Sequence, residues 1–317
     1  MTAMPQEATK LALIGNAKFA TDKPNEIRAQ LKSLLDAGEI RLRDIERITS
    51  YKGPTISQHL ADKYEGDKEK LDDALMRFYR SWIAKNAIVQ TRVVEDIHSI
   101  MLLAWRRKEI ALIRGKFGRG KSKAASRFAA LHEFAVFVEL SGITSPTELL
   151  HRVAEALNIE SQMTGSRGDK LAAIIRSLQR NPRLIVIDEA DELRPRTLAL
   201  LRDIHGERTE RCAIVLIATE RFDNILKNPE LGYLRRRITI KRDIGELALD
   251  EARAICRMWP TSISNDSIKE AYSWSSRHFG VASLVNIMMR AYDVMQLKGE
   301  EKIDDDCMDE AYAYLMD

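Results

Sequence analysis

The sequence predicts an α/β protein in which a parallel sheet carries helices on both faces, with a smaller helical domain before it and another after it. Two observations support this prediction. In the middle of the chain, short runs rich in Val and Ile alternate with segments whose apolar residues recur at helical spacing. Toward both ends, the helical spacing continues without such runs. Parallel strands need long crossover connections, so the alternation is typical of a parallel sheet. We therefore expect domains at 1–86, 87–245 and 246–317.

Length and composition exclude several classes of protein. The 317 residues are 45% hydrophobic, which is enough for a substantial core, and 50 Lys and Arg against 47 Asp and Glu leave a net charge of only +3. Affinity for nucleic acid would therefore depend on local clusters of charge. Cys212, Cys256 and Cys307 lie far apart, so neither a disulfide framework nor a zinc site is expected. Because there is no export signal or membrane-length apolar run, we expect a cytoplasmic protein without membrane contact.

The first domain is predicted to be helical throughout. Two of its helices, at 42–49 and 55–64, flank a short turn that contains Gly53, with Pro54 at the start of the second helix. This arrangement predicts a helix-turn-helix, whose second helix would enter the major groove of double-stranded DNA. A plain three-helix packing unit is the alternative. Short polar and basic groups cluster around the second helix and are the candidate DNA-binding residues: Lys52, Thr55, Ser57, Gln58, His59 and Lys63.

The middle domain is predicted to contain five strands. Each apolar run is too short for a helix and is bounded by polar residues. The runs cover 109–115, 135–141, 183–190, 212–220 and 236–242, and a helix at 97–108 precedes the first of them.

A glycine-rich loop follows the first of these strands and opens a helix. Residues 115–122, "GKFGRGKS", fit the pattern G-x-x-x-x-G-K-[ST]. Glycines allow backbone N–H groups to wrap around phosphate oxygens, and the N-terminus of the next helix favours an anion. We therefore expect ATP here, although a basic surface loop is the alternative. The candidate nucleotide-binding residues are Gly115, Gly118, Arg119, Gly120, Lys121 and Ser122.

A second motif supports the same chemistry. The run "LIVIDEAD" reads as a buried strand that ends in Asp188 and Glu189. Ligands in such sheets bind at the carboxyl ends of the strands. Asp188, together with Ser122, would hold Mg2+, and Glu189 would be the general base that polarises the attacking water. A helix N-cap followed by a first-turn acid is the alternative for this pair.

Two further groups complete the candidate catalytic residues. Thr219 ends the fourth run, where its side chain could contact the γ-phosphate or simply cap the strand. Arg235, Arg236 and Arg237 precede the fifth run, and one of them could act in trans as an arginine finger on a neighbouring subunit's nucleotide. A basic rim facing DNA or solvent is the alternative. A finger in trans would make a homo-oligomer part of the mechanism.

Taken together, the order of these motifs resembles the AAA+ ATPases that select target DNA for transposition, the family of the phage Mu B protein. The resemblance covers nearly the whole chain, and "GPTISQHLADKYEGDKEKLDDAL" at 53–75 and "LIVIDEADEL" at 184–193 are its most specific stretches. It implies an AAA+ P-loop core with an N-terminal helix-turn-helix domain and a C-terminal all-helical lid. It also implies ATP-dependent, sequence-nonspecific DNA binding, assembly as a filament, and delivery of target DNA to a transposase.

The same resemblance assigns further roles and leaves alternatives. It gives Thr219 a sensor role, places the finger within 235–237, and leaves Ser283 where a lid arginine is often found. Either Arg277 or Arg290 then substitutes, or the lid senses nucleotide weakly. By the geometry of the family, the loops 141–147 and 164–170 would line a DNA channel. A replication initiator or helicase loader of the related AAA+ branch, and a regulator switched by ATP without a DNA function, remain the alternative functions.

Overall fold

The structure, a computed structural model, describes residues 23–36, 38, 40–86, 88–140, 145–206, 212–259 and 261–316. The chain divides into two compact units. The sheet unit contains 90–248 and the return segment, 275–283, by which the chain comes back to it from the other unit. The helical unit contains the N-terminal helices together with 249–274 and 284–317.

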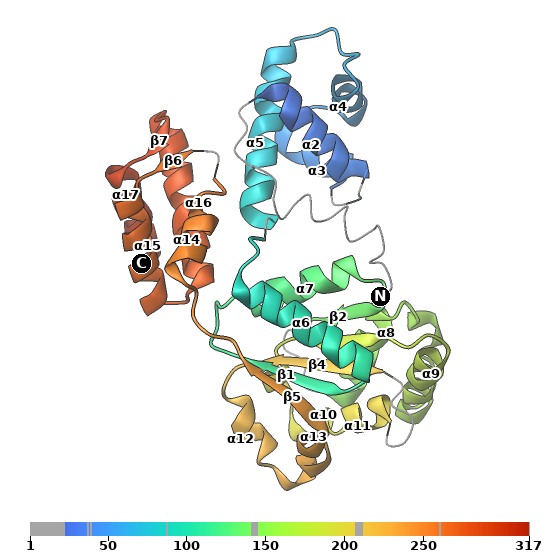
Figure 1. Cartoon of the computed structure of the whole chain (residues 1–317). Helices are drawn as coiled ribbons and strands as arrows, with labels where there is room; N and C mark the ends of the chain where they lie inside the picture. Colours follow the sequence, from blue (N-terminus) through green and yellow to red (C-terminus); the bar gives the residue numbers. More distant parts are fainter. Residues whose placement is uncertain are drawn as a thin grey trace, which may run out of the picture. The chain divides into compact units, whose positions relative to one another are not determined.

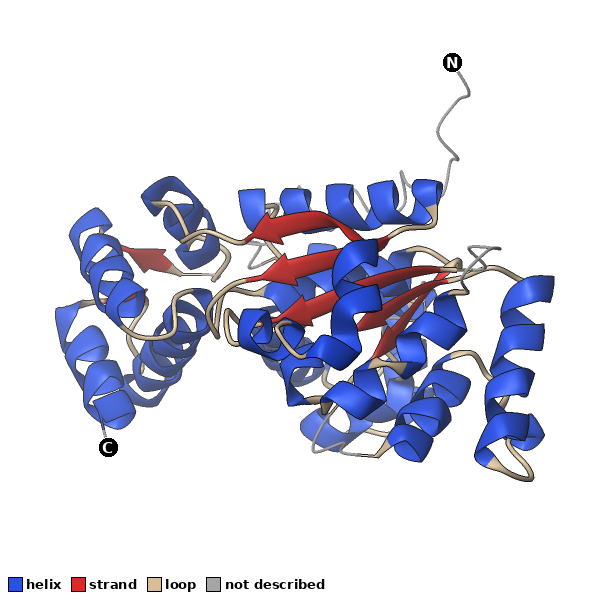
Figure 2. Ribbon diagram, turned by 90° about the horizontal axis from the view of Figure 1, so that it is seen from below, coloured by secondary structure: helices blue, strands red, loops and turns tan. Residues whose placement is uncertain are grey.

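A five-stranded parallel sheet forms the centre of the sheet unit, with the strands in the order β2-β3-β4-β1-β5. All five strands that the sequence predicts are present, and Figure 2 shows their arrowheads pointing the same way. The carboxyl ends of the strands therefore meet along one edge. The strands are β1 Ile110–Arg114, β2 Ala135–Val138, β3 Leu184–Ile187, β4 Ala213–Ala218 and β5 Ile238–Asp243.

Helices cover both faces of this sheet, as predicted (Figure 1). On one face lie α6 and α7, and on the other lie α8 to α11 and α13, with α12 beside them. The helices are α6 Arg92–Arg107, α7 Lys121–Leu131, α8 Pro146–Ala156, α9 Arg167–Arg180, α10 Pro195–Leu198, α11 Leu200–His205, α12 Phe222–Leu226 and α13 Gly232–Arg237.

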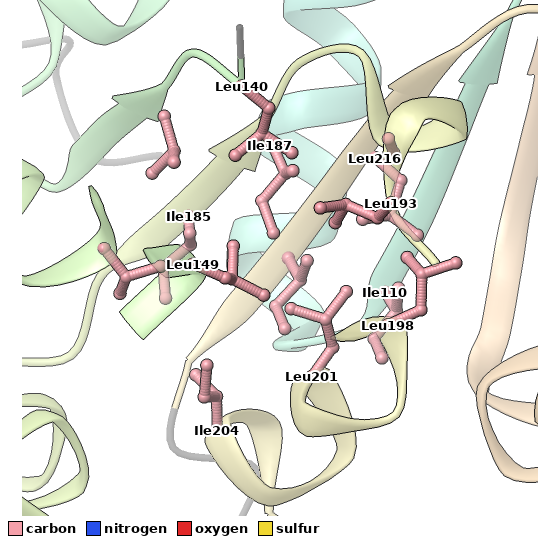
Figure 3. Packing of buried hydrophobic residues seen from close by; sticks show 14 of the residues in the cluster. Ile110, Leu140, Leu149, Ile185, Ile187, Leu193, Leu198, Leu201, Ile204 and Leu216 are labelled. Carbon is pink, nitrogen blue, oxygen red and sulfur yellow. The ribbon is translucent and has the colours of Figure 1, made fainter. Parts of the chain in front are cut away.

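The core of the sheet unit follows from the alternation of side chains along the strands. In β1, Ile110 and Leu112 point into the large apolar cluster on the side of α8 and α10, whereas the equally buried Ala111 and Ile113 face the other side. Figure 3 shows side chains of β3 and β4 meeting Leu198 and Leu201 of α10 and α11. Strands buried on both faces must be apolar throughout, which explains the continuous Val- and Ile-rich runs in the sequence.

The N-terminal part of the helical unit consists of α2 Pro24–Asp36, α3 Leu42–Thr49, α4 Gly53–Leu60 and α5 Lys68–Asn86. Its core includes Ile27, Ile45, Ile56 and Leu75, each almost fully buried and each from a different helix. The predicted pair of helices is therefore present as α3 and α4. Ser50 ends α3 with a φ of 62°, which reverses the chain before α4 begins at Gly53.

The C-terminal part contains α14 Leu249–Cys256, α15 Asn265–Arg277, α16 Val281–Lys298 and α17 Asp305–Met316. The prediction of an all-helical segment was wrong in one respect. Two short strands, β6 Ser262–Ile263 and β7 Lys302–Ile303, pair in parallel between the helices. Two residues are too few to produce an alternating pattern, so the sequence gives no sign of these strands. Among the described helices, none has the length and apolarity needed to cross a membrane.

Candidate nucleotide site

The glycine-rich loop connects the end of β1 to the start of α7 at the carboxyl edge of the sheet. Gly118 and Gly120 have φ angles of 74° and 80°, in the left-handed region that favours glycine, and Gly120 is the N-cap of α7. At Gly118 a Cβ would also overlap the backbone carbonyl of Phe279. The predicted loop is thus present, with its glycines at positions that demand them.

Lys121 is buried at the first position of α7 and points back into the loop. Its ammonium group donates hydrogen bonds to the carbonyl oxygens of Gly115, at 2.7 Å, and Lys116, at 2.8 Å. Burial lowers the pKa of Lys121, and the carboxylates of Asp188 and Asp191 oppose this shift. The Lys121 ammonium group is therefore a buried cation held by two carbonyl groups of the loop and close to two carboxylates.

Asp188 lies directly after β3, where it is buried and close to the start of α7. Its carboxylate forms a hydrogen bond with the side chain of Ser122 and accepts the backbone N–H of Glu189 at 3.0 Å. Burial raises the pKa of Asp188, whereas these hydrogen bonds and the charge of Lys121 lower it. A carboxylate beside a hydroxyl supplies the oxygen ligands that Mg2+ prefers, so these two residues fit the predicted metal role.

Glu189 follows in an unusual backbone conformation. Its φ of 53° is left-handed although the residue carries a side chain, and such strain often occurs at functional sites. The side chain is exposed, yet partial desolvation raises its pKa, followed by the negative charges of Asp188, Glu192 and Glu139. A carboxylate with a raised pKa that remains accessible is suited to accept a proton from water.

Thr219 lies directly after β4 and is buried beside Asp191. The Thr219 hydroxyl donates a hydrogen bond to the Asp191 carboxylate, which also accepts the Thr219 backbone N–H at 3.3 Å. Sequence reasoning missed Asp191, although it stands three residues after Asp188. The short helix η2, Ala190–Glu192, turns the chain so that this carboxylate faces β4.

Arg114, the last residue of β1, holds the base of the loop and was also missed by the sequence reasoning. Its guanidinium donates two hydrogen bonds to Asp243 at the end of β5, at 2.7 and 2.9 Å, and a third to Asp223 at the start of α12. Because Arg114 immediately precedes Gly115, this fork joins the loop to the ends of two other elements.

The predicted nucleotide ligand Arg119 has a different partner. Its guanidinium is buried and donates to the carboxylate of Glu246 at 2.6 Å. The neighbouring Gly118 accepts the backbone N–H of Ala282 at 3.0 Å. Ser283, at the position of the expected lid arginine, is buried and its hydroxyl accepts the N–H of Phe279 at 3.1 Å. The return segment therefore lies directly against the loop.

The three predicted finger residues end α13 and point in different directions. Arg237 lies over the ring of Tyr233, with 5.2 Å from its guanidinium carbon to the ring centroid, and Arg236 donates to the carbonyl of Gly232 at 3.3 Å. Arg235 is exposed, and within the described part of the chain its side chain has no hydrogen bond, ion pair or ring contact.

In the helical unit, the predicted DNA-binding residues divide into two groups. Lys52, Ser57, Gln58 and Lys63 are exposed around α4, and Thr55 is half-buried. The prediction for His59 was wrong, because only 1% of that residue is exposed. These side chains surround one helix, as the sequence suggested, apart from the histidine.

His59 has a structural role inside the N-terminal helices. Its Nε2 lies 2.6 Å from a carboxylate oxygen of Asp72 in α5, and its ring meets that of Tyr64 edge-on. The turn before α4 is fixed by another side chain of the N-terminal helices. The Glu46 carboxylate accepts the backbone N–H of Gly53 and so caps the start of α4.

Two other expectations concern the loops predicted to line a channel. Residues 141–144 lie outside the described residues. Lys170, in α9, donates a hydrogen bond to His151 of α8 at 2.9 Å.

A cavity of about 360 Å³ lies elsewhere, between α7, β2 and the end of α8, and Arg183 before β3 lines it. These residues are at the amino ends of the strands, so this cavity is separate from the nucleotide site.

Comparison with known proteins supports the interpretation of this site. Residues 105–226, which include the loop and both strand-end motifs, match the AAA domain family. The ATP-dependent target DNA activator B proteins of Escherichia phages Mu and D108 are each 24% identical over 302 residues, which cover 92% of this chain and 95% of each relative. The Mu-like prophage FluMu DNA transposition protein B of Haemophilus influenzae is 23% identical over 76% of this chain and 87% of its own length.

Solved structures agree on the fold. The Aeropyrum pernix ORC2 protein in its ADP form superimposes with a TM-score of 0.60 at 15% identity, over 74% of this chain and 72% of that chain. The Aeropyrum pernix ORC1 protein in complex with DNA gives 0.58 at 18% identity, over 74% and 69%. Residues 105–226 thus belong to an AAA domain with the AAA+ P-loop ATPase fold, and the B proteins of phages Mu and D108 are homologues of this chain.

Proposed function

We propose that this chain is a sequence-nonspecific DNA-binding ATPase that oligomerises on duplex DNA with ATP and delivers target DNA to a transposase. Hydrolysis then drives disassembly. The relatives named as target DNA activators cover almost the whole chain, which supports this assignment over an initiator or a DNA-independent switch. Such work would keep the protein with the DNA in the cytoplasm.

One observation carries the catalytic part of the proposal. Lys121 follows the loop after β1, Asp188 follows β3, and Thr219 follows β4, so all three lie at the carboxyl edge of neighbouring strands. The carboxylates of Asp188 and Asp191 counteract the lowering of the Lys121 pKa by burial, which agrees with this proximity. A cation, a buried carboxylate and a polar strand end meeting at one point are the parts that phosphoryl transfer requires.

Each of these residues has a distinct task in the proposal. The backbone N–H groups of the loop and the Lys121 ammonium bind the β- and γ-phosphates. Ser122 and Asp188 would hold Mg2+, which supplies charge neutralisation on the transferred phosphoryl group. Glu189 accepts the proton of the attacking water, and the Thr219 hydroxyl, which donates to Asp191, accepts a hydrogen bond from that water.

Oligomers complete the site in this proposal. A finger must leave its own subunit, so it must not be occupied by contacts within that subunit. Arg235 meets this requirement, whereas Arg236 and Arg237 contact Gly232 and Tyr233. We therefore assign the finger to Arg235, which would stabilise the charge that develops on the γ-phosphate of the adjacent copy.

Binding of DNA is assigned in part to the exposed groups around α4. Lys52 and Lys63 would contact phosphates, while Ser57 and Gln58 would contact phosphates or base edges. Contacts made mainly to the DNA backbone predict an affinity that falls steeply with salt and depends little on sequence. The logarithm of the binding constant should fall with the logarithm of the salt concentration, with a slope of about 0.9 per neutralised phosphate.

Electron microscopy and sedimentation with random duplex DNA test the function directly. We expect assemblies on any sequence in the presence of ATP and none without it. Lys121→Ala should abolish them, because the phosphates lose their buried cation. Glu160→Gln, which changes an exposed carboxylate of η1, Glu160–Gln162, is the matched control and should assemble normally. Tight binding to one sequence would instead indicate an initiator, and no DNA association in either condition would refute the proposal.

A further inference from the structure

Arg119 is a buried cation in a region that is already positive. It stands between two glycines of the phosphate loop, with 7% of the residue exposed, at the N-terminus of α7. The positive charge of Arg119 lowers the pKa of the nearby Lys121. Positive side chains at a helix N-terminus repel the helix dipole and one another, so this arrangement needs an anion to balance it.

Glu246 is the anion that balances Arg119 in this structure. The two side chains are 2.6 Å apart, and within the described residues Arg119 has no other hydrogen bond or ion pair. The contact holds the pKa of Glu246 below its usual value, and Lys116 of the same loop acts in the same direction. The carboxylate of Glu246 therefore occupies a position beside the groups that would bind a nucleotide's phosphates.

Glu246 lies close in sequence to the boundary between the two units. It belongs to the linker 244–248, which joins β5 to α14 and is the last part of the sheet unit before the chain enters the helical unit at 249. Glu246 therefore lies three residues before the chain enters the helical unit.

The second connection rests on the same loop. The return segment brings Gly280 beside the Arg119 side chain, where a Cβ at Gly280 would be 3.6 Å from the Arg119 Cδ and Nη1 atoms. The Ala282 N–H donates to the carbonyl of Gly118. Both the linker and the return segment are thus attached to the two residues Gly118 and Arg119.

We propose that the Arg119–Glu246 ion pair is a nucleotide-sensitive latch, in which the phosphates of ATP compete with the Glu246 carboxylate for Arg119 and release the linker. The inference rests on the proposed function, since it requires ATP at the phosphate loop. A triphosphate is a stronger anion than one carboxylate and also contacts Lys121, so it wins the competition when bound. Glu246 is a positioning residue that acts through Arg119.

The latch also explains how the chain can couple nucleotide to its C-terminal helices with a serine at position 283. The hydroxyl of Ser283 is hydrogen-bonded to Phe279 and fixes the return segment. Arg119 of the phosphate loop would then be the cation that contacts the nucleotide's phosphates, in place of an arginine in the first turn of α16.

Hydrogen exchange and nucleotide binding on the full-length chain test the latch together. In the wild type, a non-hydrolysable ATP analogue should raise exchange in a peptide covering 244–248. Glu246→Gln should raise this exchange without nucleotide and should lower the Kd for the analogue about two- to fivefold, the effect of removing one exposed competing charge. In steady-state hydrolysis the same variant should lower KM more than it changes kcat.

Variants at the partner residue separate charge from structure. Arg119→Lys keeps a cation and should retain the exchange response, whereas Arg119→Gln should show raised exchange that nucleotide no longer changes. Glu160→Gln, an exposed carboxylate of the same unit, should behave as the wild type in every assay.

Two negative results have different meanings. Wild-type Kd and wild-type exchange for Glu246→Gln, in a chain that binds the analogue, would overturn the latch and leave the ATPase proposal intact. Failure of the wild-type chain to bind the analogue would overturn both.

Discussion

Glu189 combines a left-handed backbone, an accessible carboxylate and a raised pKa. If it is the general base, Glu189→Gln should bind ATP with near wild-type affinity and lose hydrolysis by about 10²-fold or more, because the amide cannot accept the proton. Phosphate release and equilibrium binding of a fluorescent analogue measure the two properties. Glu160→Gln, which changes an exposed carboxylate outside this turn, is the control. Hydrolysis by Glu189→Gln at the wild-type rate would exclude Glu189 as the base.

The pH dependence of hydrolysis follows from the same group. A base acts when it is deprotonated, so kcat should rise with pH through a pKa above that of an ordinary glutamate and then level off. The acidic neighbour Glu139 contributes to the raised pKa. Glu139→Gln should therefore move the rising limb of the kcat profile to lower pH. If the rising limb of the Glu139→Gln profile moves to higher pH or stays where it is in the wild type, Glu139 does not contribute to the raised pKa.

Residue-level reasoning from the sequence succeeded where a motif fixes the local geometry and failed where burial decides. The loop and strand-end motifs place Lys121 and Asp188 without reference to distant residues. His59 lies in a polar stretch, so the sequence suggested exposure, but α5 supplies a carboxylate that pairs with it. Arg119 and Glu246 are separated by 127 residues, and no local pattern reports such a contact.

At the scale of single elements, the phosphate loop offers a matched comparison of two glycines. Gly118 and Gly120 both have positive φ, but only Gly118 lies against other backbone, while a Cβ at Gly120 would meet nothing within 4 Å. Gly120→Ala should destabilise the folded chain by about 1–2 kcal/mol from backbone strain alone. Gly118→Ala should cost clearly more, because it also displaces the return segment.

Denaturant unfolding without nucleotide measures both glycine variants under the same conditions. Equal losses of unfolding free energy would show that the return segment does not rest on the loop. The comparison is made without nucleotide because both glycines belong to the region proposed to contact phosphate.

The elements themselves were predictable to different degrees. The strands of the large sheet are buried on both faces, which imposes long apolar runs that a sequence shows clearly. The pair β6 and β7 leaves no comparable trace at two residues each. The turn between α3 and α4 depends on Glu46 and Ser50. Ser50 adopts the left-handed conformation and Glu46 caps α4, so both residues fit the turn.

At the scale of the whole molecule, a finger in trans predicts that two inactive variants can complement each other. Glu189→Gln should bind ATP and keep Arg235 but lacks the base, and Arg235→Ala should bind ATP but lacks the finger. Mixed on DNA, they should recover hydrolysis, because an Arg235→Ala subunit can receive the finger of a Glu189→Gln neighbour. Steady-state hydrolysis at varied mixing ratios measures the recovery. Activity no greater than the sum of the separate variants would exclude a finger in trans at Arg235.

The order of segments within the sheet unit limits how this protein can be shortened. A fragment that stops after β5 contains every residue of the loop and strand-end motifs, and by sequence alone it would be taken as a self-sufficient ATPase core. It would lack residues 275–283, which lie against Gly118 and Arg119. Cutting the chain there would remove the backbone that contacts the phosphate loop, so a fragment that keeps this contact has to extend through 249–274 to residue 283.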